Sequence, residues 1–345
     1  MPASFNSLPV EMVVEVVNHV DHHNHHNCGD RHTRPCIPQS TLAALNRTSK
    51  LLNSLTTRHL YRAPRYRHSN WPLFARTLIV RKDLAALVKH LYFSGENDHL
   101  DPAKFPEEIT AYYLEYYEVC NPLTVDDPAS DTEALFVASG RGRREACVEM
   151  DFIVHLCAQT VETIFVDVSL YHDAFLLMQA PTALPALKTI IFDYMHAIED
   201  GHLYLTPRLN DLIKAAAPAL TRLELSRLCL DQRHMYGGVL EGVTHLVIRC
   251  SAMRAWIFDT LLSLVPNLEI LEYEGGAGND SKWCVRVHEA YDSIVRNCEK
   301  LKSFCFDMSA VPDVDWASPR PWESVMKIRT ATDFASKGIK FQMTQ

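Results

Sequence analysis

The segment "LKTIIFD", residues 187–193, decides the fold, because its apolar-x-x-apolar-x-apolar spacing recurs along the chain. The pattern returns in the same phase in "VETIFVD" (161–167), "LTRLELS" (220–226), "VTHLVIR" (243–249), "LEILEYE" (268–274) and "LKSFCFD" (301–307), and an earlier copy lies at Val88 to Phe93. From 161 onward the copies begin 23 to 33 residues apart. Such spacing is typical of a stacked repeat of about 20–29 residues with some insertions. The sequence therefore predicts seven strands of one repeating unit.

Each predicted unit runs from a helix through a turn to a strand. "DLIKAAAPAL" and "DTLLSLVPNL" have helical spacing until they meet Pro218 and Pro266, which cannot continue a helix. Alternate strand residues point to one face, and the inward ones are expected to include Ile190, Phe192, Leu223, Leu225, Leu271 and Tyr273. Parallel strands stacked against helices would bury a core that no single unit could bury. An α/β domain whose strands merely alternate with helices is the alternative, and the common phase favours the solenoid.

Residues 101–130 and 313–345 stand outside this pattern. The first contains a tyrosine-rich stretch that predicts a helix, for which packing on the flank of the solenoid is favoured over a recognition surface. The second carries Trp316, Trp322 and Phe334 and predicts a docked C-terminal cap or a partly free tail. The chain therefore divides into an N-terminal module at 1–65, a solenoid at 66–312 and the final segment at 313–345.

The segment "SLPVEMVVEVVNHV", residues 7–20, predicts a helix that begins near Pro9. Its apolar residues recur at three- and four-residue steps, as Met12, Val13, Val16, Val17 and Val20. A proline in the first turn and Glu11 near the positive end of the dipole both suit a helix start. Leucines between 42 and 60 predict two further short helices. Three short helices bury little surface alone, so the module is expected to gain stability from a partner.

Leu8-Pro9-Val10-Glu11 before an apolar helix, followed by "LAALNRTSKLLNSLTTRHLYR" (42–62), resembles the F-box, and the ending "HLYR" is similar to fungal variants. The strand cores likewise resemble the irregular leucine-rich repeats of fungal F-box proteins. One departure is the insert at 21–38, where the family has a short loop between its first two helices. The resemblance implies an α/β fold: an N-terminal three-helix F-box followed by an irregular leucine-rich-repeat-like solenoid.

The resemblance also implies a role as substrate receptor in an SCF (Skp, cullin, F-box) ubiquitin ligase. The F-box would dock on a Skp-type adaptor, and through it on a cullin. The matching positions are Leu8, Pro9, Met12, Val13, Val16, Leu42 and Leu45. The alternative is that these side chains form the core of the module and its contact with the next domain.

In that role the solenoid would bind a protein substrate. The candidate contacts are outward strand residues, Glu224, Arg249, Glu272 and Glu274. For each of them, solvated charge on a strand face is the alternative explanation. Ubiquitin transfer would take place on another subunit, so no catalytic residue is expected in this chain.

The stretch "HVDHHNHHNCGDRHTRPC", residues 19–36, holds a dense group of potential metal ligands. Imidazole and thiolate both suit zinc, and the candidates are His25, His26, Cys28, His32 and Cys36. Structural zinc sites commonly pair ligands two to four residues apart, whereas these gaps are irregular. The favoured interpretation is a solvated loop without metal, and no cofactor is expected. A zinc ion that orders the loop is the alternative.

Composition argues against several function classes. The net charge is −8, and the basic run "RGRR" at 141–144 is too short to follow many phosphates, so nucleic acid is not an expected partner. No apolar run approaches the roughly 20 residues that cross a bilayer, and the N-terminus lacks a secretory pattern. A cytoplasmic or nuclear location is expected, with the 10 cysteines as buried or free thiols rather than disulfides.

Common catalytic motifs are also missing. The chain has neither a G-x-S-x-G nor a P-loop motif, and no G-x-G-x-x-G follows a strand pattern. An enzyme is therefore not expected. Two other functions stay open: an F-box-like interaction scaffold that acts outside a ligase, and a zinc-dependent hydrolase centred on the histidine-rich stretch.

Overall fold

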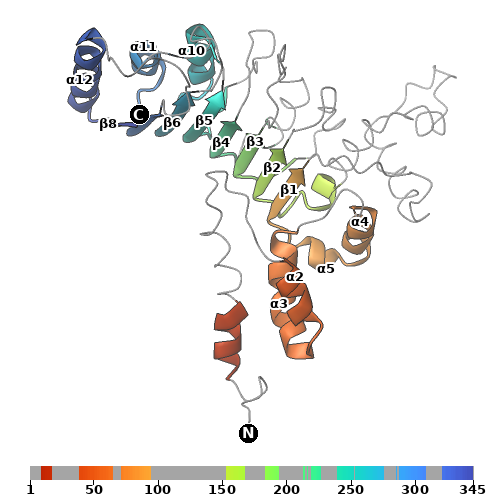
Figure 1. The fold of residues 1–345 in the computed structure, drawn as a ribbon. Coiled ribbons are helices and arrows are strands. Elements are labelled where there is room, and N and C mark those ends of the chain that lie inside the picture. Colours follow the sequence, from red (N-terminus) through yellow and green to blue (C-terminus); the bar gives the residue numbers. More distant parts are fainter. Residues whose placement is uncertain are drawn as a thin grey trace, which may run out of the picture.

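A computed structural model shows a mixed α/β fold built on one parallel sheet (Figure 1). Eight strands lie in the sheet in the order in which they occur in the sequence, β1 to β8. The structure describes residues 9–17, 39–64, 71–94, 153–167, 183–193, 213, 216, 219–226, 239–251, 253–275, 285, 287–307 and 321–344.

The seven predicted strand cores form the first seven strands of this sheet. Their bounds are β1 (His90–Ser94), β2 (Thr163–Asp167), β3 (Thr189–Asp193), β4 (Arg222–Ser226), β5 (His245–Ser251), β6 (Ile270–Gly275) and β7 (Ser303–Asp307). Neighbouring strands are parallel, and equivalent positions of the sequence pattern lie side by side. The common phase seen in the sequence is therefore the register of the sheet.

An eighth unit, which the sequence pattern does not predict, follows at the C-terminus. Helix α12 (Pro321–Ser336) leads into β8 (Lys340–Thr344), which pairs parallel with β7. Gly338 occupies the position at which the other units have their first apolar residue, so the apolar pattern does not identify this unit. Its φ of 73° is one that L side chains rarely adopt, and the Ile339 N–H donates to Phe334 O at 3.0 Å. This closes α12 with a glycine-dependent C-cap.

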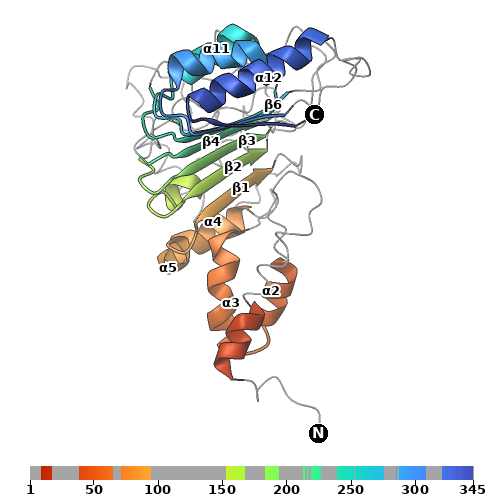
Figure 2. The ribbon, with the colours of Figure 1, turned by 90° about the vertical axis from the view of Figure 1, so that its left-hand side faces the viewer.

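Helices lie at one end of the sheet and along one of its faces. Those with defined bounds are α2 (Gln39–Asn46), α3 (Lys50–Arg62), α4 (Trp71–Val80), α5 (Lys82–Ala85), α10 (Ala255–Ser263), α11 (Val287–Asn297) and α12. Residues 10–17 are also helical. Figure 2 shows α11 and α12 along one side of the strands and the N-terminal helices beyond β1. The two faces of the sheet therefore have different surroundings.

One backbone carbonyl before each strand joins neighbouring units. The oxygen of Lys188, just before β3, accepts the N–H groups of Thr221 and Arg222, both at 2.9 Å. The carbonyls that precede β1, β2, β4, β5 and β6 each accept two N–H groups of the following unit in the same way. The series begins in the helices, because Arg62 O at the end of α3 accepts the Lys89 N–H at 2.8 Å. Backbone hydrogen bonds thus connect the N-terminal helices to the sheet.

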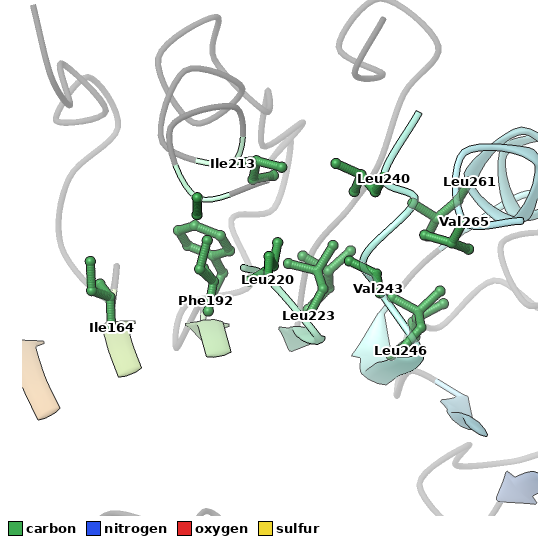
Figure 3. Close-up of a cluster of buried hydrophobic side chains, with 14 of the residues drawn as sticks. Ile164, Phe192, Ile213, Leu220, Leu223, Leu240, Val243, Leu246, Leu261 and Val265 are labelled. Atoms are coloured by element: carbon green, nitrogen blue, oxygen red, sulfur yellow. The ribbon is translucent and has the colours of Figure 1, made fainter. Parts of the chain in front are cut away.

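The core lies between the inner face of the sheet and the helices. All the residues predicted to point inward are at most 2% exposed, which confirms the prediction for Ile190, Phe192, Leu223, Leu225, Leu271 and Tyr273. Figure 3 shows Phe192, Leu223 and Leu246 of this face pointing toward the segments above the strands, which contribute apolar residues such as Ile213 and Leu261. Full burial of each large apolar side chain contributes about 1.5–3 kcal/mol. Stacking of the units is therefore what stabilises them.

Two cysteines belong to this core. Cys157 and Cys298 are buried free thiols. Burial raises the pKa of each to about 12, since an apolar surrounding disfavours the thiolate. For these two residues the expectation of buried thiols is confirmed.

The N-terminal helices have a small core of their own. It consists of Val13, Val17, Leu42, Leu52 and Ala63. The first helix starts as predicted, because Pro9 O accepts the N–H groups of the residues three and four positions later. Ser49 caps α3 by accepting the Leu52 N–H at 3.2 Å. Tyr92 of β1 packs against this core and so joins it to the sheet.

Aromatic rings close the other end of the sheet. The Phe304, Phe334 and Phe341 ring centroids lie 5.1 to 5.6 Å apart. Phe334 comes from α12 and is fully buried, while the other two come from β7 and β8. The last helix and strand therefore cover the end of the apolar core, as a C-terminal cap would.

Candidate functional site

The second face of strands β4 to β6 carries charged side chains where the inner face carries leucines. Glu224 and Glu272 occupy the same row of the sheet, with Val247 of β5 between them. Arg222 and His245 lie side by side in the row before it. Strand alternation places these residues opposite the buried core, because each stands next to an inward-facing residue of its strand, Leu223, Leu246 or Leu271. The register of the strands therefore places these charged residues in rows across the sheet.

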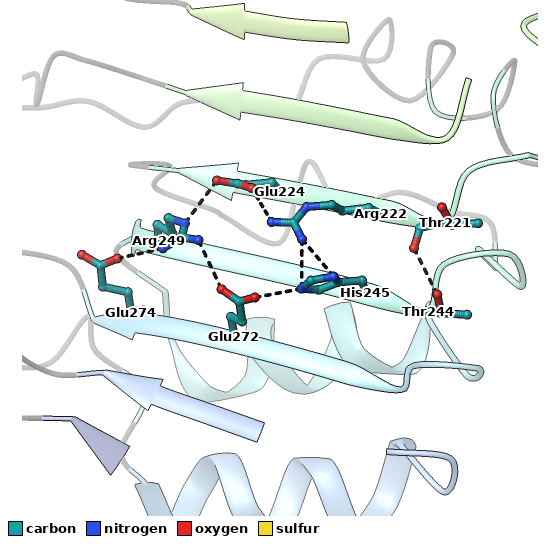
Figure 4. Close-up of polar contacts among 8 residues, drawn as sticks. All are labelled: Thr221, Arg222, Glu224, Thr244, His245, Arg249, Glu272 and Glu274. Carbon is teal, nitrogen blue, oxygen red and sulfur yellow. Dashed lines mark hydrogen bonds and ion pairs between the residues drawn. The ribbon is translucent and has the colours of Figure 1, made fainter. Parts of the chain in front are cut away.

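Arg249 is the centre of this charged group, as Figure 4 shows. Its Nε donates to Glu224 Oε1 at 3.1 Å and its Nη2 donates to Glu272 Oε2 at 3.2 Å. A third carboxylate, Glu274, places Oε2 3.7 Å from Nη1. One guanidinium on β5 therefore holds carboxylates from both neighbouring strands.

Arg222 and His245 complete the network. Arg222 donates from Nη2 to Glu224 Oε2 at 3.0 Å, and its Nη1 lies 2.9 Å from His245 Nδ1. His245 Nε2 lies 2.9 Å from Glu272 Oε1. A guanidinium can only donate, so His245 accepts at Nδ1 from Arg222 and donates from Nε2 to Glu272. The histidine thus links a cation on β4 to a carboxylate on β6.

The network favours the charged forms of Glu272 and Arg249. The hydrogen bond from His245 lowers the pKa of the Glu272 carboxyl, and the positive charge of Arg249 lowers it further against the opposing effect of burial. Burial opposes the charge of Arg249, but Glu224 and Glu272 outweigh it and raise the pKa of the guanidinium. A preorganised set of fixed charges of this kind is suited to ionic recognition.

Val247 shows how the charged side chains cover the sheet. It lies on the charged face and is nevertheless 0% exposed. Its neighbours in the row are Glu224 and Glu272. Long polar side chains can bury apolar surface beneath their stems while their charged ends meet water. Side chains of the network are therefore placed to cover Val247 on this part of the sheet.

All four outward residues predicted from the sequence belong to this one network: Glu224, Arg249, Glu272 and Glu274. Sequence reasoning missed Arg222 and His245. A signal for them exists, because each is the first residue of its strand and has the phase of the outward positions. Extending the outward set to the first residue of each strand would have found both.

The predicted adaptor-binding residues are divided between surface and core. Met12 and Val16 are 53% and 40% exposed, and Pro9 is also exposed. Val13 and Leu42 are 2% and 0% exposed. Their burial favours the alternative explanation, in which they form the core of the module. Leu45 packs partly buried against this core, and Leu8 lies outside the described residues.

The histidine-rich stretch cannot be placed in this structure. The zinc candidates His25, His26, Cys28, His32 and Cys36 lie outside the described residues, as does the tyrosine-rich segment at 101–130. In the part of the chain that the structure describes, no three His, Cys, Asp or Glu side chains gather as a metal site would require. Within the same residues, none of the helices has both the length and the apolar character needed to cross a membrane.

Comparison with known proteins found no matching family model and no matching curated protein.

Proposed function

We propose that this protein is the substrate-receptor subunit of an SCF-type ubiquitin ligase. Its N-terminal helices form an F-box that docks on a Skp-type adaptor, which in turn binds a cullin. Its sheet is an irregular leucine-rich-repeat-like solenoid whose charged face binds a protein substrate. The chain itself carries out no chemistry in this role. Its task is to hold the substrate in a fixed position relative to the adaptor.

The observation that carries the proposal is the common register of parallel strands that follow the order of the sequence, with one irregularity near the end of β5. Repeat proteins are built in this way, because each unit contacts mainly its neighbours and the stack buries one continuous core. The helices occupy one face and leave side chains of β4 to β6 accessible on the other: those of Arg222, Arg249 and Glu272 are 28% to 34% exposed. An extended face of fixed charges is a surface on which a protein segment can bind.

The first helix supports the docking part of the proposal. Val13 and Val17 face the small core of the module, while Val10, Met12 and Val16 are 40% to 53% exposed. Exposed apolar residues that gather on one element can mark an interaction site. Full burial of each such side chain would contribute about 1.5–3 kcal/mol. An adaptor that covers these residues would gain this energy without disturbing the core beneath them.

The connection between the helices and the sheet supports the positioning role. Arg62 O binds the Lys89 N–H at the start of β1, and Tyr92 packs into the core of the helices. Ala63 and Pro64, which lead out of α3, are both buried. A protein bound to the first helix would therefore be held in a defined geometry relative to the sheet.

Capture of a purified Skp-type adaptor by the full-length chain tests the proposal. We expect binding by the wild type and by a variant that lacks residues 21–38. Val16→Lys should weaken binding about tenfold or more, because a charged ammonium would replace a buried methyl contact. Val295→Lys is the matched control, since Val295 is a helical valine of similar exposure, 39%, on α11.

Two results would contradict the docking assignment. Equal weakening by Val16→Lys and Val295→Lys would show that the first helix is not the contact. Failure of the wild type and of the deletion variant to bind would favour the interaction scaffold that acts outside a ligase.

A further inference from the structure

The charged face has more carboxylates than guanidiniums. Glu224, Glu272 and Glu274 surround Arg249, and Arg222 is the second guanidinium. The register adds a further carboxylate, because Asp307 of β7 lies beside Glu274. The face formed by these strands therefore has more negative than positive side chains, even though Glu224, Glu272 and Glu274 each lie close to an arginine.

The electrostatic surroundings of Cys305 show which sign of charge predominates nearby. It lies on β7 beside Glu272, in the same row. Burial raises the pKa of its thiol, the carboxylates of Glu272 and Asp307 raise it further, and Arg249 acts in the opposite direction. Both nearby carboxylates thus disfavour a negative charge at this position.

The hydrogen-bonding capacity of the network is also unequal. Arg249 already uses its Nε and Nη2 donors on Glu224 and Glu272. An ionised carboxylate can accept about four hydrogen bonds. Glu272 accepts from Arg249 and pairs with His245, and its side chain remains 34% exposed. Glu272 therefore keeps capacity to accept a further hydrogen bond at the surface.

On the basis of the receptor role proposed above, we propose that the face of β4 to β7 binds a basic segment of the protein substrate. Lysine or arginine side chains of that segment donate to Glu224 and Glu272, which lie in one row with Glu274 nearby, and the fixed guanidinium of Arg249 holds these carboxylates in place. An acidic or phosphorylated segment would be repelled by the excess of carboxylates and would have to displace them from Arg249. Charge complementarity therefore selects a cationic partner.

The distance between strands within one row predicts the distance between the two cations of the bound segment. Glu224 and Glu272 lie in one row with a single strand between them, which corresponds to about 9.6 Å. A peptide in the polyproline II conformation has three residues per turn and rises about 3.1 Å per residue. Two cations three residues apart would lie on the same side of it, about 9.3 Å from each other. A Lys-x-x-Lys segment laid across the strands therefore matches the face.

The test is fluorescence anisotropy of the full-length chain with labelled peptides. The probe has proline and serine around a Lys-x-x-Lys core, and the comparison peptide replaces both lysines with glutamate. We expect the lysine peptide to bind and the glutamate peptide not to bind. Added salt should weaken binding, since the interaction is between exposed charges.

Glu272→Gln should weaken binding of the lysine peptide about fivefold, a typical loss for one partly exposed ion pair. Glu299→Gln, which removes an exposed carboxylate beyond the end of α11, is the matched control and should have no effect. Glu274→Gln is the second variant in case Glu272→Gln disturbs folding, which circular dichroism would reveal. Tighter binding of the glutamate peptide, no binding of the lysine peptide, or equal loss in Glu299→Gln would overturn the proposal.

The adaptor experiment separates this proposal from the receptor role. A chain that captures the adaptor but does not bind the lysine peptide is a receptor whose substrate class we assigned wrongly. A chain that binds the peptide through Glu272 but does not capture the adaptor keeps the basic-segment site and loses the ligase.

Discussion

The two faces of strands β4 to β6 are formed by alternate residues of the same segments, and different requirements determine which residue types lie on each face. On the inner face, Leu223, Leu246 and Leu271 are at most 2% exposed and pack in the continuous core. On the outer face, one position along each strand, Glu224, Val247 and Glu272 lie in a charged row. The inner row must be apolar for the units to stack. The outer row is free to carry recognition chemistry, because it contributes less to stacking.

The largest effect is expected from a cavity on the inner face. Leu246→Ala should lower the free energy of unfolding by about 2–5 kcal/mol, because the residue is fully buried and its neighbours cannot collapse into the space. Urea unfolding followed by circular dichroism measures the change. Val247→Ala, the adjacent residue on the charged face, removes fewer carbons and should cost clearly less. An equal loss in both variants would mean that the two faces do not differ as we describe.

Removal of the central cation should have the next largest effect. Arg249→Leu leaves the three neighbouring carboxylates without the guanidinium that holds them, and we expect a loss of about 1–3 kcal/mol at neutral pH. The loss should shrink below the pKa of the carboxyls, because protonation removes their repulsion. Denaturant midpoints of the variant and the wild type at pH 7 and pH 4 would show this. A loss that is the same at both pH values would argue that Arg249 acts only by packing.

A smaller effect is expected from acid alone. The folded pKa of Glu272 lies below its usual value of 4.5, so its contribution is complete above that pH and is lost as the pH falls through the folded pKa. Because the Glu272 side chain is 34% exposed, we expect this contribution to be under about 1 kcal/mol. Thermal melts between pH 6 and pH 3 should fall less steeply for Glu272→Gln than for the wild type. Parallel curves for the two proteins would contradict the assignment.

The smallest effect is expected from an ion pair that lies entirely in solvent. Arg81 and Asp83 approach to 2.6 Å, and the hydrogen bond from Arg81 lowers the pKa of the Asp83 carboxyl. Both side chains are more than half exposed, and exposed pairs of this kind contribute little. Asp83→Asn should therefore leave the melting midpoint unchanged. A clear drop would show that geometry alone, without burial, gives an ion pair its strength in this protein.

Much of the sheet could be predicted from the sequence, whereas the eighth unit could not. The seven predicted strands share a buried apolar-x-x-apolar-x-apolar pattern, and burial on one face requires that pattern. In the last unit Gly338 replaces the first apolar residue, and its backbone conformation ends α12 instead. Because a glycine is needed to end α12, the last unit lacks the first apolar residue of the pattern that identifies the other units.

The candidate site was predictable in part for a related reason. The outward phase identified Glu224, Arg249, Glu272 and Glu274, which the structure joins in one network. The same phase did not distinguish Val13 and Leu42 of the module core from the exposed Met12 and Val16, because a helix with apolar residues around more than one side leaves open which of them faces inward.

The sequence by itself determined the strands, their common phase and the inner face that they bury, since these follow from the alternation of side chains along a strand. Only the tertiary structure decided that residues 23 to 27 positions apart in the sequence contact one another and form one charged group. Arg249 meets Glu224 and Glu272 because parallel pairing places β5 between β4 and β6. The shared register sets the distances among their charges, and no local pattern along a single strand contains that information.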